Sequence, residues 1–100
     1  MKGVTLHNEA KAELAEAIAY YAGQRAGLGR DFRAVVDAAI QEIRRRPKLY
    51  PKHIEEIRKR TLQRFPYTIY YAELEDGIYV LAIAHQSREP GYWLDRHIEV

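Results

Sequence analysis

The sequence predicts an α+β domain in which a helical hairpin packs on one face of a largely antiparallel sheet. Its 100 residues suffice for one small domain, 1–100, with a modest core. The clearest signal is a β-hairpin in the last third of the chain, where a Glu-Asp-Gly turn at 75–77 joins strand-like segments at 67–74 and 78–85. Two segments with helical periodicity lie upstream, which gives the order β-α-α-β-β-β.

A short edge strand and a first helix open the chain. Residues 4–6 are β-prone and few, as is typical of an edge strand. Asn8 is a good helix N-cap, and Glu9 in the first turn suits the helix dipole. Apolar residues then recur at helical spacing and stop before Gly23, at Ala10, Leu14, Ala17, Ile18 and Tyr21. The pattern predicts one amphipathic helix.

A Gly-Leu-Gly break at 27–29 separates this helix from a second one with stricter periodicity. Its apolar positions recur at helical spacing without a gap, at Phe32, Val35, Val36, Ala39, Ile40 and Ile43. Pro47, whose ring is excluded from a helix interior, marks its end. So short a connection predicts an antiparallel hairpin. We expect one core shared by the second helix and the last strand, made of Phe32, Val36, Ile40, Ile43, Leu81 and Ile83.

The sheet is expected to continue after the helices. Residues 48–53 are typical of a loop, residues 54–64 indicate one strongly basic strand, and Pro66 marks a bend before the hairpin. Residues 78–84 are apolar on both faces, which predicts a central strand. A short turn or helix is expected near 90–96.

The charge of the chain is concentrated in its middle. Residues 44–64 hold nine Lys and Arg against two Glu, a local net charge of +7. Such a stretch favours an anionic partner, either a nucleic acid or an acidic protein segment. The cations at 44–46 also complement the C-terminal dipole of the second helix, which is the purely structural alternative.

Composition excludes several classes of protein. The chain has no cysteine, hence no disulfide framework or thiolate site, and we expect it in the cytoplasm. No signal peptide and no apolar run long enough for a membrane span is present in the sequence. The four histidines are scattered, and no glycine-rich phosphate loop occurs. We therefore expect no metal and no cofactor.

Polar, cationic and aromatic residues gather directly after the last strand. Sites are often built on loops that a rigid sheet supports. We take the following residues as candidates for binding a target: His85, Gln86, Arg88, Tyr92, Trp93 and Arg96. The alternative is that Tyr92 and Trp93 cap the core while the charges are merely solvated.

The same region could support RNA cleavage without a metal. A 2′-hydroxyl would attack the adjacent phosphate, with His85 as acid or base and Arg88 as phosphate clamp. The full candidate set is Lys59, Arg60, Arg64, His85, Arg88 and Tyr92. These groups could equally hold an acidic peptide, or do no more than satisfy the core.

Over nearly its whole length the chain resembles the RelE/ParE toxin superfamily of bacterial type II toxin–antitoxin systems, of the plasmid-stabilisation type. The matching segments are IAYYAGQRAGLG, IRRRPKLYP, RFPYTIYY and VLAIAHQSREPGYW. The resemblance implies a β-α-α-β-β-β fold with a helical hairpin against the sheet.

The superfamily divides by target. RelE-like members cleave mRNA on the ribosome, whereas ParE-like members poison DNA gyrase and are not thought to be nucleases. Arg88 and Lys59 match residues of the ribonuclease set, but Thr68 stands where that branch carries a catalytic arginine, and Thr61 where it carries a lysine. LAIAHQSR, by contrast, resembles the ParE side.

The resemblance therefore implies a growth-inhibiting, ParE-like gyrase inhibitor that is not an enzyme. Two alternatives stay open: a RelE-like, metal-independent mRNA endoribonuclease, and a decayed member that binds its antitoxin without being toxic. The partner implied is a cognate antitoxin whose disordered C-terminal segment folds along the toxin. Its acidic side chains would meet the basic stretch at Arg44, Arg45, Arg58 and Arg60. Direct contact with nucleic acid is left open.

Overall fold

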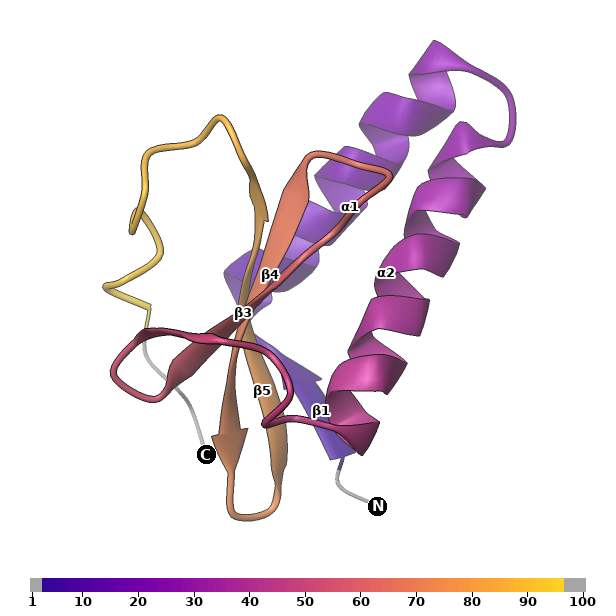
Figure 1. The fold of residues 1–100 in the computed structure, drawn as a ribbon. Helices are drawn as coiled ribbons and strands as arrows, with labels where there is room; N and C mark the ends of the chain where they lie inside the picture. The colour runs from indigo at the N-terminus through magenta and orange to yellow at the C-terminus, as the bar shows by residue number, and fades with distance from the viewer. Residues whose placement is uncertain (1–2, 97–100) are drawn as a thin grey trace.

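The computed structural model describes residues 3–96, which form two helices packed on one five-stranded sheet (Figure 1). The strand order across the sheet is β1-β5-β4-β3-β2. All neighbouring strands are antiparallel except β1 and β5. The elements are β1 Gly3–Leu6, α1 Asn8–Gln24, α2 Leu28–Arg45, β2 Lys52–Ile54, β3 Ile57–Thr61, β4 Tyr67–Leu74 and β5 Gly77–His85. The predicted α+β fold class is confirmed.

The expected edge strand β1 pairs in parallel with β5, from Gly3 opposite Gly77 to Leu6 opposite Val80. The connection between these two parallel strands begins with the helical hairpin and continues through β2, β3 and β4. β5 therefore lies between β1 and β4, and the prediction of a central last strand is confirmed.

The first helix differs from prediction at both ends. His7, not Asn8, is its N-cap, and the Glu9 backbone N–H donates to His7 Nδ1 at 3.0 Å. A histidine nitrogen thus fills the role that a short polar side chain usually takes. The helix also continues through Gly23 to Gln24, because a single exposed glycine costs only about 1 kcal/mol in a helix.

The break between the helices is shorter than predicted. Gly27 is the N-cap of α2 with φ of 84°, but Leu28 and Gly29 already belong to the helix. Gly29 is buried, and a Cβ there would lie 2.7 Å from the Ile18 carbonyl oxygen of α1. This glycine is needed for the close approach of the two helices and not for a turn.

The basic region contains two strands, so the prediction of a loop at 48–53 and one strand at 54–64 is wrong. β2 and β3 form a tight antiparallel hairpin whose turn contains Glu55 with φ of 49°. β3 ends at Thr61, and residues 62–66 form a loop before β4. The turn has no glycine, proline or asparagine, so it carried none of the usual turn signals.

A β-bulge divides the central strand β5 into two halves. Tyr70 lies opposite Ala82 and Tyr71 opposite Val80, which leaves Leu81 as the extra residue. Ile78, Val80 and Ile83 therefore all face the helices. The predicted core is confirmed for Phe32, Val36, Ile40, Ile43 and Ile83. It is wrong for Leu81, which packs with Ala72 and Tyr79 in a separate cluster.

The segment that follows β5, residues 86–96, forms turns and no helix. Figure 1 shows it on the side of the sheet away from α2. Trp93 anchors it, with its ring 4.4 Å from the Tyr70 ring and 5.9 Å from that of His53. From there the segment reaches back to α1, where Arg96 binds Glu13. We call residues 86–96 the C-terminal segment below.

Candidate functional site

The main cleft of the described chain lies between α1, the ends of β4 and β5, and the C-terminal segment, with a volume of about 580 Å³. Its walls are largely tyrosine rings, and its polar groups come from residues at and after the end of β5 and from two carboxylates of α1, Glu13 and Glu16. The residues that matter here are Tyr20, Tyr21, Tyr67, Tyr92, His85 and Arg88. Three of the six expected target-binding residues, His85, Arg88 and Tyr92, thus meet in one place.

The ring of His85 is held by defined contacts at the edge of this cleft. Its ring contacts Tyr67 edge to face, with centroids 5.0 Å apart. The Ser87 backbone N–H donates to His85 Nδ1 at 3.0 Å, and the Ser87 hydroxyl lies 2.7 Å from the same nitrogen. Because a backbone amide can only donate, Nδ1 is the unprotonated nitrogen. In this arrangement Nδ1 is the accepting nitrogen of the ring and Nε2 the donating one.

Arg88 and Tyr92 form a stacked pair on the opposite wall. The Arg88 guanidinium lies 3.9 Å above the Tyr92 ring centroid. The Tyr92 hydroxyl donates to Glu13. Burial, together with this hydrogen bond, raises the pKa of Tyr92 well above its ordinary value. The phenol stays protonated at physiological pH and serves as a fixed donor.

The Arg96 side chain is buried and ion-paired. Its side chain is only 7% exposed, and its two terminal nitrogens each lie 2.9 Å from a Glu13 oxygen. It also donates to the Leu81 carbonyl at 2.9 Å. The hydrogen bond to Glu13 raises the pKa of Arg96 further, against the opposing effect of burial. Arg96 supports the cleft from behind.

Glu13 is a site residue that sequence reasoning missed. It lies three residues after Ala10 and four before Ala17, the two buried residues of α1. That spacing puts a carboxylate on the apolar face of the helix, where a charge needs partners. The pattern alone would have marked Glu13, although not the residues that bind it.

The other three expected target-binding residues, Gln86, Trp93 and Arg96, are not among the residues that line the main cleft. Trp93 is 1% exposed and caps the outer face of the sheet over Tyr70. Gln86 is exposed, and its side-chain amide donates weakly to the Tyr67 carbonyl at 3.4 Å. Trp93 therefore caps the core as in the alternative interpretation, whereas Arg96 is buried in an ion pair and is not a solvated charge.

The residues of the ribonuclease hypothesis are divided among three places. His85, Arg88 and Tyr92 surround the main cleft. Arg60 and Arg64 line a second groove of about 540 Å³ between α2 and β3, and Arg64 pairs with Asp31 at 3.0 Å. Lys59 lies opposite Tyr70, on the face of the sheet away from the helices.

Thr68 marks the position where the ribonuclease branch carries an arginine. It is 6% exposed and lies between Thr61 of β3 and Ala84 of β5. The side chain is uncharged and enclosed. It contributes no cation to either groove.

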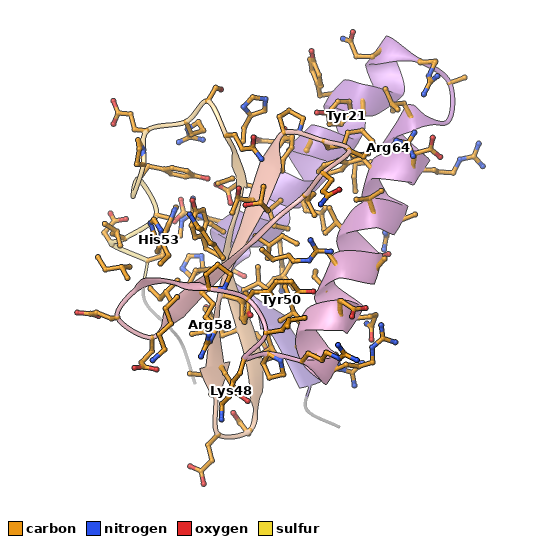
Figure 2. The ribbon with its side chains drawn as sticks, viewed as in Figure 1. Tyr21, Lys48, Tyr50, His53, Arg58 and Arg64 are labelled. Atoms are coloured by element: carbon orange, nitrogen blue, oxygen red, sulfur yellow. The ribbon has the colours of Figure 1, made fainter. Side chains whose placement is uncertain are left out.

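Two of the arginines expected at the antitoxin interface contact the loop between α2 and β2. Arg58 donates to the Tyr50 carbonyl at 2.7 Å and to that of Lys48 at 3.4 Å (Figure 2). The Arg60 guanidinium lies 5.0 Å from the Tyr50 ring centroid. Within the described chain, the buried Arg60 Nε atom has no hydrogen-bond partner.

The other two, Arg44 and Arg45, lie at the exposed end of α2. Arg44 donates to Gln41 at 3.0 Å, and Arg45 pairs with Glu42. Both contacts are within one helix and on the surface, where they contribute little to stability. Arg45 is exposed, and Arg44 is half-buried.

The comparisons with known proteins agree with this geometry. A family model described as the ParE toxin of type II toxin–antitoxin systems, parDE, matches residues 4–90. The chain belongs to the ParE toxin family. The resemblance inferred from the sequence is thereby confirmed. The family match includes His85 and Arg88 and ends before Tyr92 and Arg96.

The fold of this ParE-family chain is also similar to a solved structure, the chromosomal ParDE TA system from P. aeruginosa. The TM-score is 0.61 at 16% sequence identity, over 85% of this chain and 96% of the other. A comparison with curated protein sequences gives no match. In the part of the chain that the structure describes, no helix has the length and apolar character to cross a membrane.

Proposed function

We propose that this ParE-family toxin inhibits DNA gyrase and is neutralised by a cognate antitoxin. The observation that carries the choice of target is the separation of the cationic residues: Lys59, the pair Arg60 and Arg64, and the His85–Arg88 cleft lie in three different places. Growth arrest, action in the cytoplasm and stabilisation of a plasmid carrying the module follow from that activity.

This separation disfavours a ribonuclease mechanism. Cleavage of RNA by its own 2′-hydroxyl needs a base, an acid and a charge stabiliser within hydrogen-bond reach of one phosphate. The main cleft supplies His85 and Arg88. Among the described residues that line it, Arg88 is the one Lys or Arg, and Thr68 is uncharged and buried.

The groove between α2 and β3 supports binding of an acidic antitoxin segment. Its floor contains Val35, Ala38 and Leu62, and Arg60 and Arg64 stand at its side. An amphipathic segment would place apolar side chains on this floor and carboxylates against the arginines. Arg44 and Arg45 extend the positive surface along α2. A disordered segment that folds on binding suits such an extended groove.

The experiment compares two reactions with the same purified protein. We expect it to inhibit gyrase supercoiling and to leave mRNA intact in a translating extract. Arg88→Ala should weaken the inhibition, because it removes the accessible cation of the cleft. Arg33→Ala is the matched control, since Arg33 is an exposed arginine of α2 that pairs only loosely with Asp37 at 3.8 Å.

Two results would contradict the proposal. Codon-phased mRNA cuts that vanish in Arg88→Ala, with supercoiling unaffected, would establish the RelE-like endoribonuclease. No effect in either reaction, with antitoxin still bound, would establish a member that has lost its toxicity.

A further inference from the structure

We propose that Glu13 is a positioning residue, whose carboxylate holds the C-terminal segment so that Arg88 is presented to the target. The role in target binding rests on the proposed function. The role in holding the segment rests on geometry alone.

Glu13 and Arg96 complete an edge of the sheet that β1 leaves open. The pairing of β1 with β5 ends at Leu6 opposite Val80, and the His7 N–H donates to the Val80 carbonyl at 2.9 Å. Further along β5, Arg96 donates to the Leu81 carbonyl at 2.9 Å and the Ile83 N–H donates to Glu13 at 3.0 Å. An ion pair of side chains thus supplies the donor and acceptor that a longer β1 would have supplied.

Both oxygens of Glu13 are fully used. Oε1 accepts from the Ile83 N–H and from Arg96, and Oε2 accepts from the Tyr92 hydroxyl and from Arg96. The carboxylate is 13% exposed and its partner Arg96 7%. Removing the negative charge would leave the buried guanidinium with the Leu81 carbonyl and, at 3.6 Å, the exposed carboxylate of Glu9 as partners. Losing the main partner of a buried charge is far costlier than breaking a surface pair.

The contacts continue from Glu13 to the cleft. Tyr92 binds Glu13 through its hydroxyl and supports Arg88 on the face of its ring. The ring is thus fixed at its polar end by α1, and the guanidinium takes its position from the ring. Glu13 influences Arg88 through Tyr92, without contacting the target itself.

The C-terminal segment has a second anchor that does not involve Glu13. Trp93 is packed on Tyr70 and His53 on the outer face of the sheet. Loss of the Glu13 charge should therefore loosen the part of the segment next to α1 while the domain stays folded. This separates a positioning role from a general structural one.

The first test measures backbone hydrogen exchange in Glu13→Gln. The amides to follow are those of Ile83, Leu94 and Arg96, the last two of which donate within the segment to Gly91 and Trp93. We expect these amides to exchange about a hundredfold faster. Loss of one partner of a buried ion pair changes the equilibrium for local opening by about two powers of ten or more. Amides of α2 and β4 should be unchanged. Glu16→Gln, the same change one turn along α1 at an exposed position of the same cleft, should leave all rates unchanged.

The second test is a double-mutant cycle for inhibition of gyrase. Glu13→Gln alone should weaken inhibition about tenfold or more, and Tyr92→Phe, which removes only the hydroxyl, by less. The double variant, Glu13→Gln with Arg88→Ala, should inhibit gyrase as strongly as Arg88→Ala alone, because Glu13 acts through Arg88. A fully additive loss would overturn the route through Arg88.

The exchange experiment decides the positioning role even if gyrase is not the target. Unchanged protection of the three amides in Glu13→Gln would overturn the proposal. Equal acceleration at every amide of the domain would also overturn it, since Glu13 would then contribute only to global stability. A wild-type protein without effect on gyrase, but with the expected local acceleration, would refute the proposed target and retain the positioning role.

Discussion

Lys59 and Arg60 are neighbours in β3, yet their side chains lie on opposite faces of the sheet. Lys59 is opposite Tyr70, whose ring packs against Trp93 on the outer face. Arg60 is opposite Ile69 of the helix-side core and lines the groove beside α2. Strand alternation produces this arrangement, and a partner bound along one face therefore meets only one of the two cations.

The first prediction uses that pair to locate the antitoxin. Arg60→Ala should weaken antitoxin binding about ten- to a hundredfold, the worth of a hydrogen bond to a charged group. Lys59→Ala should have little effect, because its side chain faces away from the groove. Titration calorimetry with the cognate antitoxin measures both. A larger loss in Lys59→Ala would place the antitoxin on the outer face.

The second prediction compares two glycines in the helices. Gly29→Ala should destabilise the fold by about 1–3 kcal/mol, because the added Cβ would lie 2.7 Å from the Ile18 carbonyl oxygen and 3.0 Å from Ala22 Cβ. Gly23→Ala should stabilise it by about 0.4–1 kcal/mol, since nothing lies within 4 Å of the new Cβ. Denaturant unfolding gives both values. Equal effects of the two substitutions would contradict the close approach of the helices.

The third prediction concerns the two apolar clusters on either side of the sheet. Ile40→Ala in the helix-side core and Leu81→Ala in the outer cluster should each cost about 2–5 kcal/mol. Both residues are buried, at 7% and 2% exposure. Leu49→Ala is the control, because Leu49 is 58% exposed and its removal should cost less than about 0.5 kcal/mol. An unchanged unfolding midpoint in Leu81→Ala would mean that the bulge is misplaced.

The fourth prediction concerns alkaline pH. Burial raises the pKa of Tyr71 from 10.0 to about 12, and its hydroxyl donates to the Pro47 carbonyl at 2.6 Å. The native state thus favours the neutral phenol. The resulting stability is complete below pH 10 and is lost as the pH rises from 10 towards 12. The pH dependence of the denaturant midpoint measures this loss.

Two phenylalanine variants isolate the contribution of Tyr71. Tyr71→Phe should lower stability at neutral pH, because the Pro47 carbonyl loses its donor, and should flatten the alkaline decline. Tyr20→Phe is the control, the same loss of a hydroxyl at an exposed side chain. Stability that stays constant in the wild type above pH 10 would contradict the prediction.

Much of this fold could be predicted because local signals agreed with the final packing. The periodicity from Phe32 to Ile43 and the turn at 75–77 each dictate one element with little help from the rest of the chain. The β2–β3 hairpin was missed because Glu55 takes a positive φ that its residue type seldom adopts. Leu28 and Gly29 were missed because the helix contact that needs Gly29 is tertiary.

The site was less accessible to sequence reasoning for a similar reason. His85 and Arg88 could be expected in one place because both follow the same strand. The face of Leu81 depends on a bulge, which alternation alone does not predict. The main partner of Arg96, Glu13, lies 83 residues away in sequence, on α1, and no local pattern reports such a distant pair. Which arginines are buried and which are exposed was therefore decided by the fold.

The parallel pairing of β1 with β5 also determines when this toxin can fold during its synthesis. Gly3 leaves the ribosome well before its partner Gly77, so β1 stays unpaired while the helical hairpin and the intervening strands are made. Contacts so distant in sequence form late, because the loop between them must close first. The nascent chain should lack its central strand and the cleft beside it until residues 77–96 have been translated. Nascent chains stalled before Gly77 should be cut readily by protease, and an antitoxin already in the cell would meet the toxin before it can act.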